Sequence, residues 1–136
     1  MKIILATHGD FCHGIKQSYE MLAGTNDSII PVSLSSTDTG EFKKEIENLI
    51  GNDEYLILCD IFGGSPFNEV SKIALKNPDR IKVFSGLNLP ILLECGVMEK
   101  AGFNIEKIVS AIKDVAANSC KQFDTSSDPQ FEEDIF

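Results

Sequence analysis

Clusters of basic residues and long apolar runs are both missing from this chain of 136 residues. Its 12 Lys and Arg face 21 Asp and Glu, a formal net charge of −9. Nucleic-acid binding requires clustered cations against phosphates, so this balance argues against it. No apolar run approaches the roughly 18 residues of a membrane span, and the apolar stretch at the N-terminus is too short for a signal peptide. We therefore expect a soluble, cytoplasmic protein.

Closely spaced cysteines are missing as well. The four cysteines are far apart and form no Cys-x-x-Cys pair: Cys12, Cys59, Cys95 and Cys120. This spacing favours reduced thiols over a disulfide framework or a zinc site. A mass of 14.9 kDa with 43% hydrophobic residues is enough for one folded core. We expect one domain over residues 1–123 and an acidic tail over residues 124–136.

Apolar runs alternate along the chain with segments of helical period. Strands are expected over residues 2–6, 29–34, 55–59 and 81–85, each followed by helical sequence. The first helix, residues 11–23, carries on one face Phe11, Ile15, Tyr19 and Leu22. This alternation predicts repeated βαβ units: an α/β fold with a doubly wound, mostly parallel sheet and helices on both of its faces. Pro31 lacks a backbone donor and places residues 29–34 at an edge of the sheet.

The polar residues that follow the strands suggest a reactive site. His8 follows the first strand, Asp60 the third, and the turn of residues 86–88 the fourth. The carboxyl ends of parallel strands lie at the same edge of the sheet. A flavodoxin-like strand order 2-1-3-4 would then make His8 and Asp60 neighbours. The carboxylate would then hold one ring nitrogen and leave the other free to attack.

A glycine turn after Asp60 can supply donors to a phosphoryl group on that free nitrogen. Gly63, Gly64 and Ser65 open the third helix, with Ser65 expected as its N-cap and Pro66 at the first helical position. Each residue also has an ordinary structural explanation. His8 could be a satisfied polar residue, Asp60 could cap its own turn, and the glycine turn could simply start a helix. His13 is interpreted as a solvated or capping residue, and Cys12 and Cys59 as small core residues.

Three motifs, in order over residues 1–117, make the chain resemble the IIA domain of the mannose family of the sugar phosphotransferase system (PTS). They are Thr7-His8-Gly9, residues 60–68 (DIFGGSPFN) and residues 86–90 (GLNLP). The resemblance implies a cytoplasmic phosphotransferase that accepts a phosphoryl group from the phosphohistidine of HPr and passes it to a histidine of the IIB component. The sugar is then phosphorylated during transport through the IIC and IID membrane subunits. Neither a cofactor nor a metal is implied.

The same resemblance assigns roles to individual residues. It implies that His8 is phosphorylated on Nε2, that Asp60 holds Nδ1, and that Gly63, Gly64 and Ser65 lie near the phosphoryl group. A second set would form the rim that partners dock against: Gly9, Phe11, Phe62, Asn88 and Leu89.

The resemblance also bears on assembly and location. Members form homodimers in which a C-terminal strand crosses to the partner's sheet, and residues 119–123 are the candidate strand here. Because the chain ends at Phe136, IIB is expected to be a separate protein. Through the transporter complex, the protein would lie at the inner face of the membrane.

Two other functions stay open from the residues. One is the phosphotransfer subunit of a dihydroxyacetone kinase, which shares the fold and the histidine; its serine-rich turn fits Thr7-His8-Gly9-Asp10 less well. The other is a receiver or binding module with Asp60 as phosphoacceptor. A receiver needs an acidic cluster after the first strand to hold Mg²⁺, and only Asp10 stands there.

Overall fold

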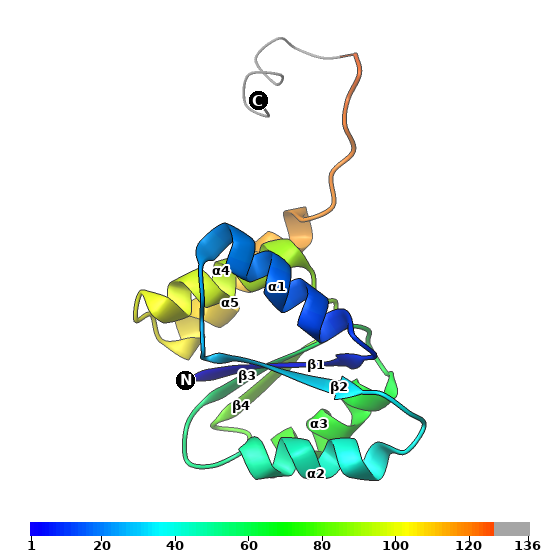
Figure 1. Cartoon of the computed structure of the whole chain (residues 1–136). Helices are drawn as coiled ribbons and strands as arrows, with labels where there is room; N and C mark the ends of the chain where they lie inside the picture. The colour runs from blue at the N-terminus through cyan, green and yellow to red at the C-terminus, as the bar shows by residue number, and fades with distance from the viewer. Residues whose placement is uncertain (127–136) are drawn as a thin grey trace.

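The computed structural model describes residues 1–126 of the chain, as a sheet between two layers of helices (Figure 1). The strands are β1 (Lys2–His8), β2 (Ile29–Leu34), β3 (Tyr55–Cys59) and β4 (Ile81–Phe84). The helices are α1 (Phe11–Ala23), α2 (Thr39–Leu49), α3 (Ser65–Leu75), α4 (Leu89–Lys100) and α5 (Ile105–Asn118). Most of the expected tail, from residue 127 onward, lies outside the described residues.

All strand pairs in the described sheet are parallel, in the order β2-β1-β3-β4. This confirms the order predicted from the sequence, the central position of β3 and the edge position of β2. The chain leaves β1 toward β2 on one side and returns to β3 on the other side. The carboxyl ends of β1 and β3 therefore flank the point where the winding reverses, which is where doubly wound sheets place their ligands.

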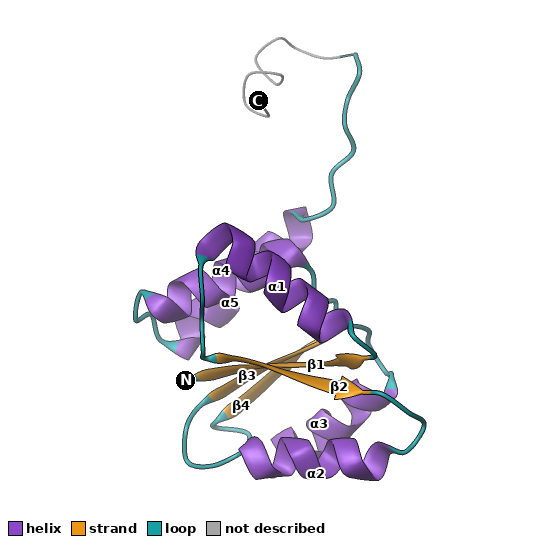
Figure 2. Cartoon of the chain, viewed as in Figure 1, coloured by secondary structure: helices purple, strands orange, loops and turns teal. Residues whose placement is uncertain are grey.

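Residues of β1 alternate between the two faces of the sheet. Ile3 and Leu5 pack under α1, α4 and α5, while Ile4 and Ala6 pack against α2 and α3. Figure 2 shows both helical layers, with α1, α4 and α5 above the strands and α2 and α3 below them. A parallel sheet covered on both faces needs strands that are apolar throughout, and this is why the continuous runs in the sequence marked the strands.

The structure corrects several details of the expected elements. The first strand continues two residues beyond Ala6 to His8, because β2 pairs with it as far as Leu34. In α1, Tyr19 is fully buried as expected, but Phe11 and Leu22 are 45% and 65% exposed. The N-cap of α3 is Gly64, so Ser65 is already helical and makes no capping bond. No described helix has the length and apolar content that crossing a bilayer requires.

A close contact between α1 and α4 supports the first helical layer. The Tyr19 ring packs against the backbone of Gly96, and its hydroxyl accepts a 3.4 Å hydrogen bond from the Asn26 side chain. Asn26, itself buried, also donates to the carbonyl of Gly96 at 3.2 Å. Position 96 therefore has no room for a side chain, because a Cβ there would stand 2.5 Å from Tyr19 Cε2.

We predict that Gly96→Ala destabilises the protein by about 1–3 kcal/mol, because the added methyl group forces a fully buried ring to move. Gly14→Ala is the matched control: Gly14 is also helical, and a Cβ there would have no neighbour within 4 Å. That control should gain about 0.5–1 kcal/mol through helix propensity. Urea unfolding followed by circular dichroism measures both. A Gly96→Ala protein as stable as the wild type would contradict the prediction.

Candidate active site

His8 is the last residue of β1, and Asp60 follows the last residue of β3. The two strands are hydrogen-bonded neighbours, with Ala6 opposite Cys59. The sheet thus delivers both side chains to one end, as the sequence predicted. The His8 side chain is 46% exposed and that of Asp60 is 15% exposed, so the ring is accessible while the carboxylate lies behind it.

One oxygen of Asp60 receives two hydrogen bonds from the same residue. The Oδ2 atom accepts the backbone N–H of His8 at 3.0 Å and lies 2.8 Å from its ring nitrogen Nδ1. The second oxygen, Oδ1, accepts the backbone N–H of Ile61 at 3.0 Å. An ionised carboxylate can only accept, so the ring must place its proton on Nδ1. The lone pair then lies on Nε2, the outer nitrogen.

The pKa of Asp60 reflects two opposing influences. Burial favours the neutral acid and raises the pKa, but the bonds from the backbone and ring of His8, with that from Ile61, favour the carboxylate. The bonds outweigh the burial, and the pKa of Asp60 lies below its ordinary value. The residue is therefore ionised at neutral pH and holds the Nδ1–H tautomer of His8.

The other edge of the imidazole lies against Gly64, the N-cap of α3. A Cβ at this position would stand only 2.9 Å from Cε1 of His8, between the two ring nitrogens. The missing side chain lets the ring approach the helix N-terminus, whose first backbone N–H groups have no intrahelical partner. Ser65 follows with an exposed side chain. The adjacent Gly63 is held from behind, since the Asn68 side chain donates to its carbonyl at 3.0 Å.

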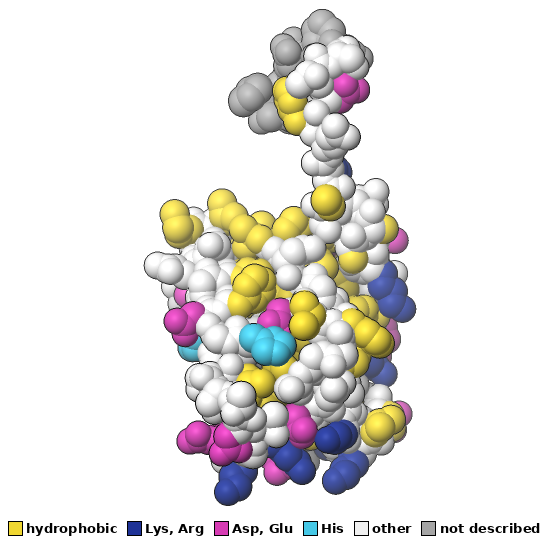
Figure 3. All heavy atoms as spheres, turned by 90° about the vertical axis from the view of Figure 1, so that its right-hand side faces the viewer, with side chains coloured by type: hydrophobic (Ala, Val, Ile, Leu, Met, Phe, Trp, Pro, Cys, Tyr) yellow, Lys and Arg dark blue, Asp and Glu magenta, His cyan; other side chains and the backbone are white. Residues whose placement is uncertain are grey.

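Apolar side chains surround this polar centre. Phe62 is 79% exposed, with its ring centroid 4.8 Å from that of Phe67, and Ile61 is 56% exposed. Figure 3 looks onto this end of the sheet and shows a histidine bordered by hydrophobic side chains and one acidic side chain. Phe62 was among the rim residues predicted from the sequence, whereas Ile61 and Phe67 were not. The sequence feature that could have indicated them is that both are apolar residues in places where polar residues are usual, a turn for Ile61 and the start of a helix for Phe67.

The remaining residues predicted for the rim belong to the start of α1, the turn before it and the region where α4 begins. An open hollow of about 810 Å³ between α1 and the loop before α4 is lined by Phe11, Asn88 and Leu89. Asn88 also supports the local structure, because its side chain accepts the backbone N–H of Ile91 as the N-cap of α4 and donates to Ser119 Oγ, both at 3.0 Å. Gly9 turns the chain between His8 and α1 with φ +54°, a conformation that favours glycine.

Neither cysteine near this end of the sheet has the features of a reactive thiol. Cys12 and Cys59 are fully buried. Burial, together with the nearby charge of Asp60, raises the pKa of Cys59 to about 12, which keeps the thiol protonated. His13 is exposed on the first turn of α1. No three His, Cys, Asp or Glu side chains among residues 1–126 gather as metal ligands would.

The fold and site together define a doubly wound α/β protein with an oriented histidine at its topological switch point. The family model described as the PTS system fructose IIA component, EIIA-man, matches residues 2–113. The chain belongs to this family and is a IIA component of the mannose family of the phosphotransferase system, a system of sugar transport. The resemblance found in the three sequence motifs is thereby confirmed.

Individual relatives agree with this assignment. The fructose-specific EIIA component of Bacillus subtilis is 31% identical over 99 residues, which are 69% of this chain and 67% of that protein. The mannose-specific EIIAB component of Escherichia coli K12 is 29% identical over 97 residues, 68% of this chain but only 30% of that longer protein. A solved EIIA structure from Streptococcus agalactiae matches with a TM-score of 0.82 and 29% identity, covering 90% of this chain and 96% of that one.

We predict that Asp60→Asn is less stable than the wild type at neutral pH, and that the difference disappears in acid. A carboxyl whose pKa is lowered by folding stabilises the folded state above its unfolded pKa of about 3.9. That contribution is lost as pH falls through the lower, folded pKa. Urea unfolding of both proteins between pH 6.5 and pH 2.5 measures it. A difference that stayed constant over this range would show that the charge on Asp60 does not stabilise the fold.

Proposed function

We propose that this protein is a phosphocarrier that takes a phosphoryl group from the phosphohistidine of HPr onto Nε2 of His8. It then passes the group to a histidine of the IIB component, for sugar uptake through IIC and IID. The observation that supports this best is the 2.8 Å bond between His8 Nδ1 and Asp60 Oδ2, which leaves Nε2 as the exposed nucleophile. Family membership supports the same role for the chain as a whole.

The transfer needs no proton to move at the reacting nitrogen. The lone pair of Nε2 attacks phosphorus, and the bond from phosphorus to the donor nitrogen breaks with its electron pair returning to the donor ring. Since His8 keeps its proton on Nδ1, the phosphorylated ring carries positive charge. The ionised Asp60 stabilises that charge, so the carboxylate is compatible with a phosphoryl group nearby. In the return step, the same nitrogen takes back its electron pair.

The start of α3 is suited to stabilise the oxygens of the transferred group. Gly64 touches the edge of the imidazole, and the N–H of Ser65 and its hydroxyl follow at the helix N-terminus, where anions are favoured. Gly63 shapes the turn beside them. Phosphoryl transfer depends mainly on positioning and charge stabilisation, and these groups provide both without a metal ion.

The docking surface in this proposal consists of the apolar residues around His8. Phe62 follows Asp60 in the turn before α3 and is 79% exposed, and Phe11 and Leu89, with the polar Asn88, line the hollow between α1 and the loop before α4. Gly9 lies in the turn directly after His8. In Figure 3, Lys and Arg side chains lie along the lower and right-hand margins of this face, away from the histidine. Partners would thus meet an apolar surface with a polar centre, which would exclude water around the transferred group.

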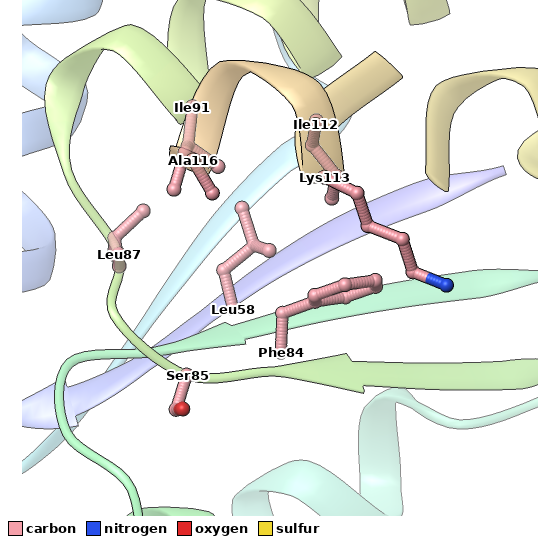
Figure 4. Close-up of a pocket in the computed structure, with 8 residues that line it drawn as sticks. All are labelled: Leu58, Phe84, Ser85, Leu87, Ile91, Ile112, Lys113 and Ala116. Carbon is pink, nitrogen blue, oxygen red and sulfur yellow. The ribbon is translucent and has the colours of Figure 1, made fainter. Parts of the chain in front are cut away.

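We also propose that the protein forms a homodimer through the edge of β4. In the described sheet, β4 is an edge strand with no neighbouring strand on its outer side. Beside it lies a hollow of about 170 Å³ lined by Leu58, Phe84 and Ile112, with Lys113 reaching across from α5 (Figure 4). Residues 120–124 contain neither helix nor strand in the single chain and extend away from the domain (Figure 1). The predicted candidate strand, residues 119–123, thus lies outside the sheet of its own chain.

We predict that incubation with phosphoenolpyruvate, enzyme I and HPr labels the wild type in an acid-labile manner. His8→Ala should lose the label completely, since the attacking nitrogen is gone. His13→Ala is the control and should be labelled like the wild type, because His13 lies on the exposed face of α1 rather than beside Asp60. Absence of label on the wild type, or undiminished label on His8→Ala, would refute the phosphocarrier proposal.

We predict that Phe62→Ser raises the KM for phospho-HPr by roughly tenfold, since an exposed aromatic ring at an interface contributes on the order of 1–2 kcal/mol. The kcat should change little, because Phe62 does not touch the reacting nitrogen. Leu75→Ser is a matched control: Leu75 is 81% exposed against 79% for Phe62, but lies at the far end of α3. Steady-state kinetics of phosphoryl transfer measure the KM and kcat of each variant. Equal effects of both substitutions on the KM would argue against a docking role for Phe62.

A further inference from the structure

Thr7 is a buried polar residue with no part in the transfer described above. Among residues 1–126, only Thr7 and Asn26 are polar and buried, and Thr7 is completely inaccessible. Its hydroxyl oxygen accepts the backbone N–H of Cys12 at 2.9 Å. A purely structural position in a buried β-strand would suit Val or Ile better, because burying a hydroxyl costs free energy unless it is hydrogen-bonded. The hydroxyl therefore has a specific role.

That hydrogen bond closes the turn that carries His8. Cys12 is the second residue of α1, and the N-cap residue Asp10 makes no capping bond with its side chain. Thr7, on the preceding strand, supplies the acceptor that an N-cap would normally provide. Its bond joins residues five positions apart and encloses the backbone of residues 8–11. The start of α1 is thus tied directly to the end of β1.

The turn has two further attachments, one to each neighbouring strand. The N–H of Gly9 donates to the carbonyl of Leu34 on β2 at 2.9 Å, and the N–H of His8 donates to Asp60 beyond β3 at 3.0 Å. The Cys12 sulfur also lies 3.3 Å from the Ser33 hydroxyl on β2. Thr7 provides the attachment on the helix side. Without it, the first turn of α1 and the residues before it would be held only from the strands.

We propose that Thr7 is a positioning residue for His8: its hydroxyl oxygen fixes the β1–α1 turn so that Nδ1 faces Asp60 and Nε2 faces outward. The inference rests on the proposed phosphocarrier role of His8. Displacement of the reacting atoms by about 1 Å can cost on the order of a hundredfold in rate, so even a small relaxation of the turn would be visible in phosphoryl transfer.

The test compares Thr7→Val with Thr7→Ser. Valine keeps the shape of threonine but lacks the acceptor, whereas serine keeps the acceptor and loses only a methyl group. With phospho-HPr as donor, Thr7→Val should lower the kcat of His8 phosphorylation by roughly tenfold or more, and its KM should stay near the wild-type value because the docking residues are untouched. The Thr7→Ser protein should keep most of the wild-type kcat.

The tautomer of the His8 ring is a second measurement, and it would not change if Thr7 only stabilised the fold. In ¹⁵N spectra recorded at about pH 8, the His8 ring of the wild type should show the Nδ1–H tautomer. Thr7→Val should show a mixture of tautomers, while Thr7→Ser should resemble the wild type. The exposed His13 serves as the internal reference. This measurement needs no phosphoryl donor, so it tests Thr7 even if wild-type labelling fails and the proposed function is wrong.

Two results would overturn the inference. The first is a folded Thr7→Val protein with the wild-type kcat and tautomer, which would make Thr7 an ordinary core residue. The second is that the variants without the hydroxyl do not fold. If Thr7→Val is unfolded by circular dichroism, Thr7→Ala replaces it, since it differs from Thr7→Ser only by the oxygen. If Thr7→Ala is unfolded too, the hydroxyl serves folding rather than the position of His8.

Discussion

The site depends on one carboxylate oxygen that receives two N–H groups of the same residue. Asp60 Oδ2 holds His8 through its backbone at 3.0 Å and through its ring nitrogen at 2.8 Å, so both the position of the residue and the direction of the ring are determined. An ion pair exposed to solvent would contribute little. Here the carboxylate is only 15% exposed, and it must stay charged to accept all its bonds. Burial raises the pKa of Asp60, but the hydrogen bonds lower it by more, so the carboxyl group stays ionised.

The fold makes this pair possible because β1 and β3 are adjacent while their connections run over opposite faces of the sheet. At that switch point the connections lead away to either side of the strand ends, so His8 remains accessible from outside. Because helices cover both faces of the sheet, Ile3 to Ala6 are buried, and the polar side chains that follow this apolar run are Thr7 and His8. The change from apolar to polar sequence therefore coincides with the end of the sheet that carries the candidate site.

Much of this was predictable from the sequence, and what was missed has a physical cause. Strand positions follow from burial on both faces, and residues 29–34 and 55–59 were predicted with their observed limits. The pairing of His8 with Asp60 followed from the strand order. The N-cap of α3 was wrong, because propensity favours Ser over Gly there, whereas the contact of position 64 with the His8 ring excludes a side chain. Contacts of that kind come from tertiary structure and leave no local pattern. The docking residues were predicted from resemblance alone, because exposure of Phe62 or Phe11 depends on how the turns fold.

A phosphocarrier of the kind proposed must release its phosphoryl group as readily as it accepts it, and under that proposal the charges around His8 suit both directions. In the proposed cycle, the carboxylate stabilises the positive phosphorylated ring, which favours acceptance. The same charge lies close enough to repel a phosphoryl group, which limits how strongly the phosphorylated form is held. The helix N-terminus beside Gly64 offsets that repulsion only in part, since a macrodipole acts as about half a charge. A stronger cation in place of that N-terminus would trap the group on His8, and a site without Asp60 would leave the tautomer undetermined. The balance of one carboxylate against one helix end therefore fits a relay better than a terminal acceptor.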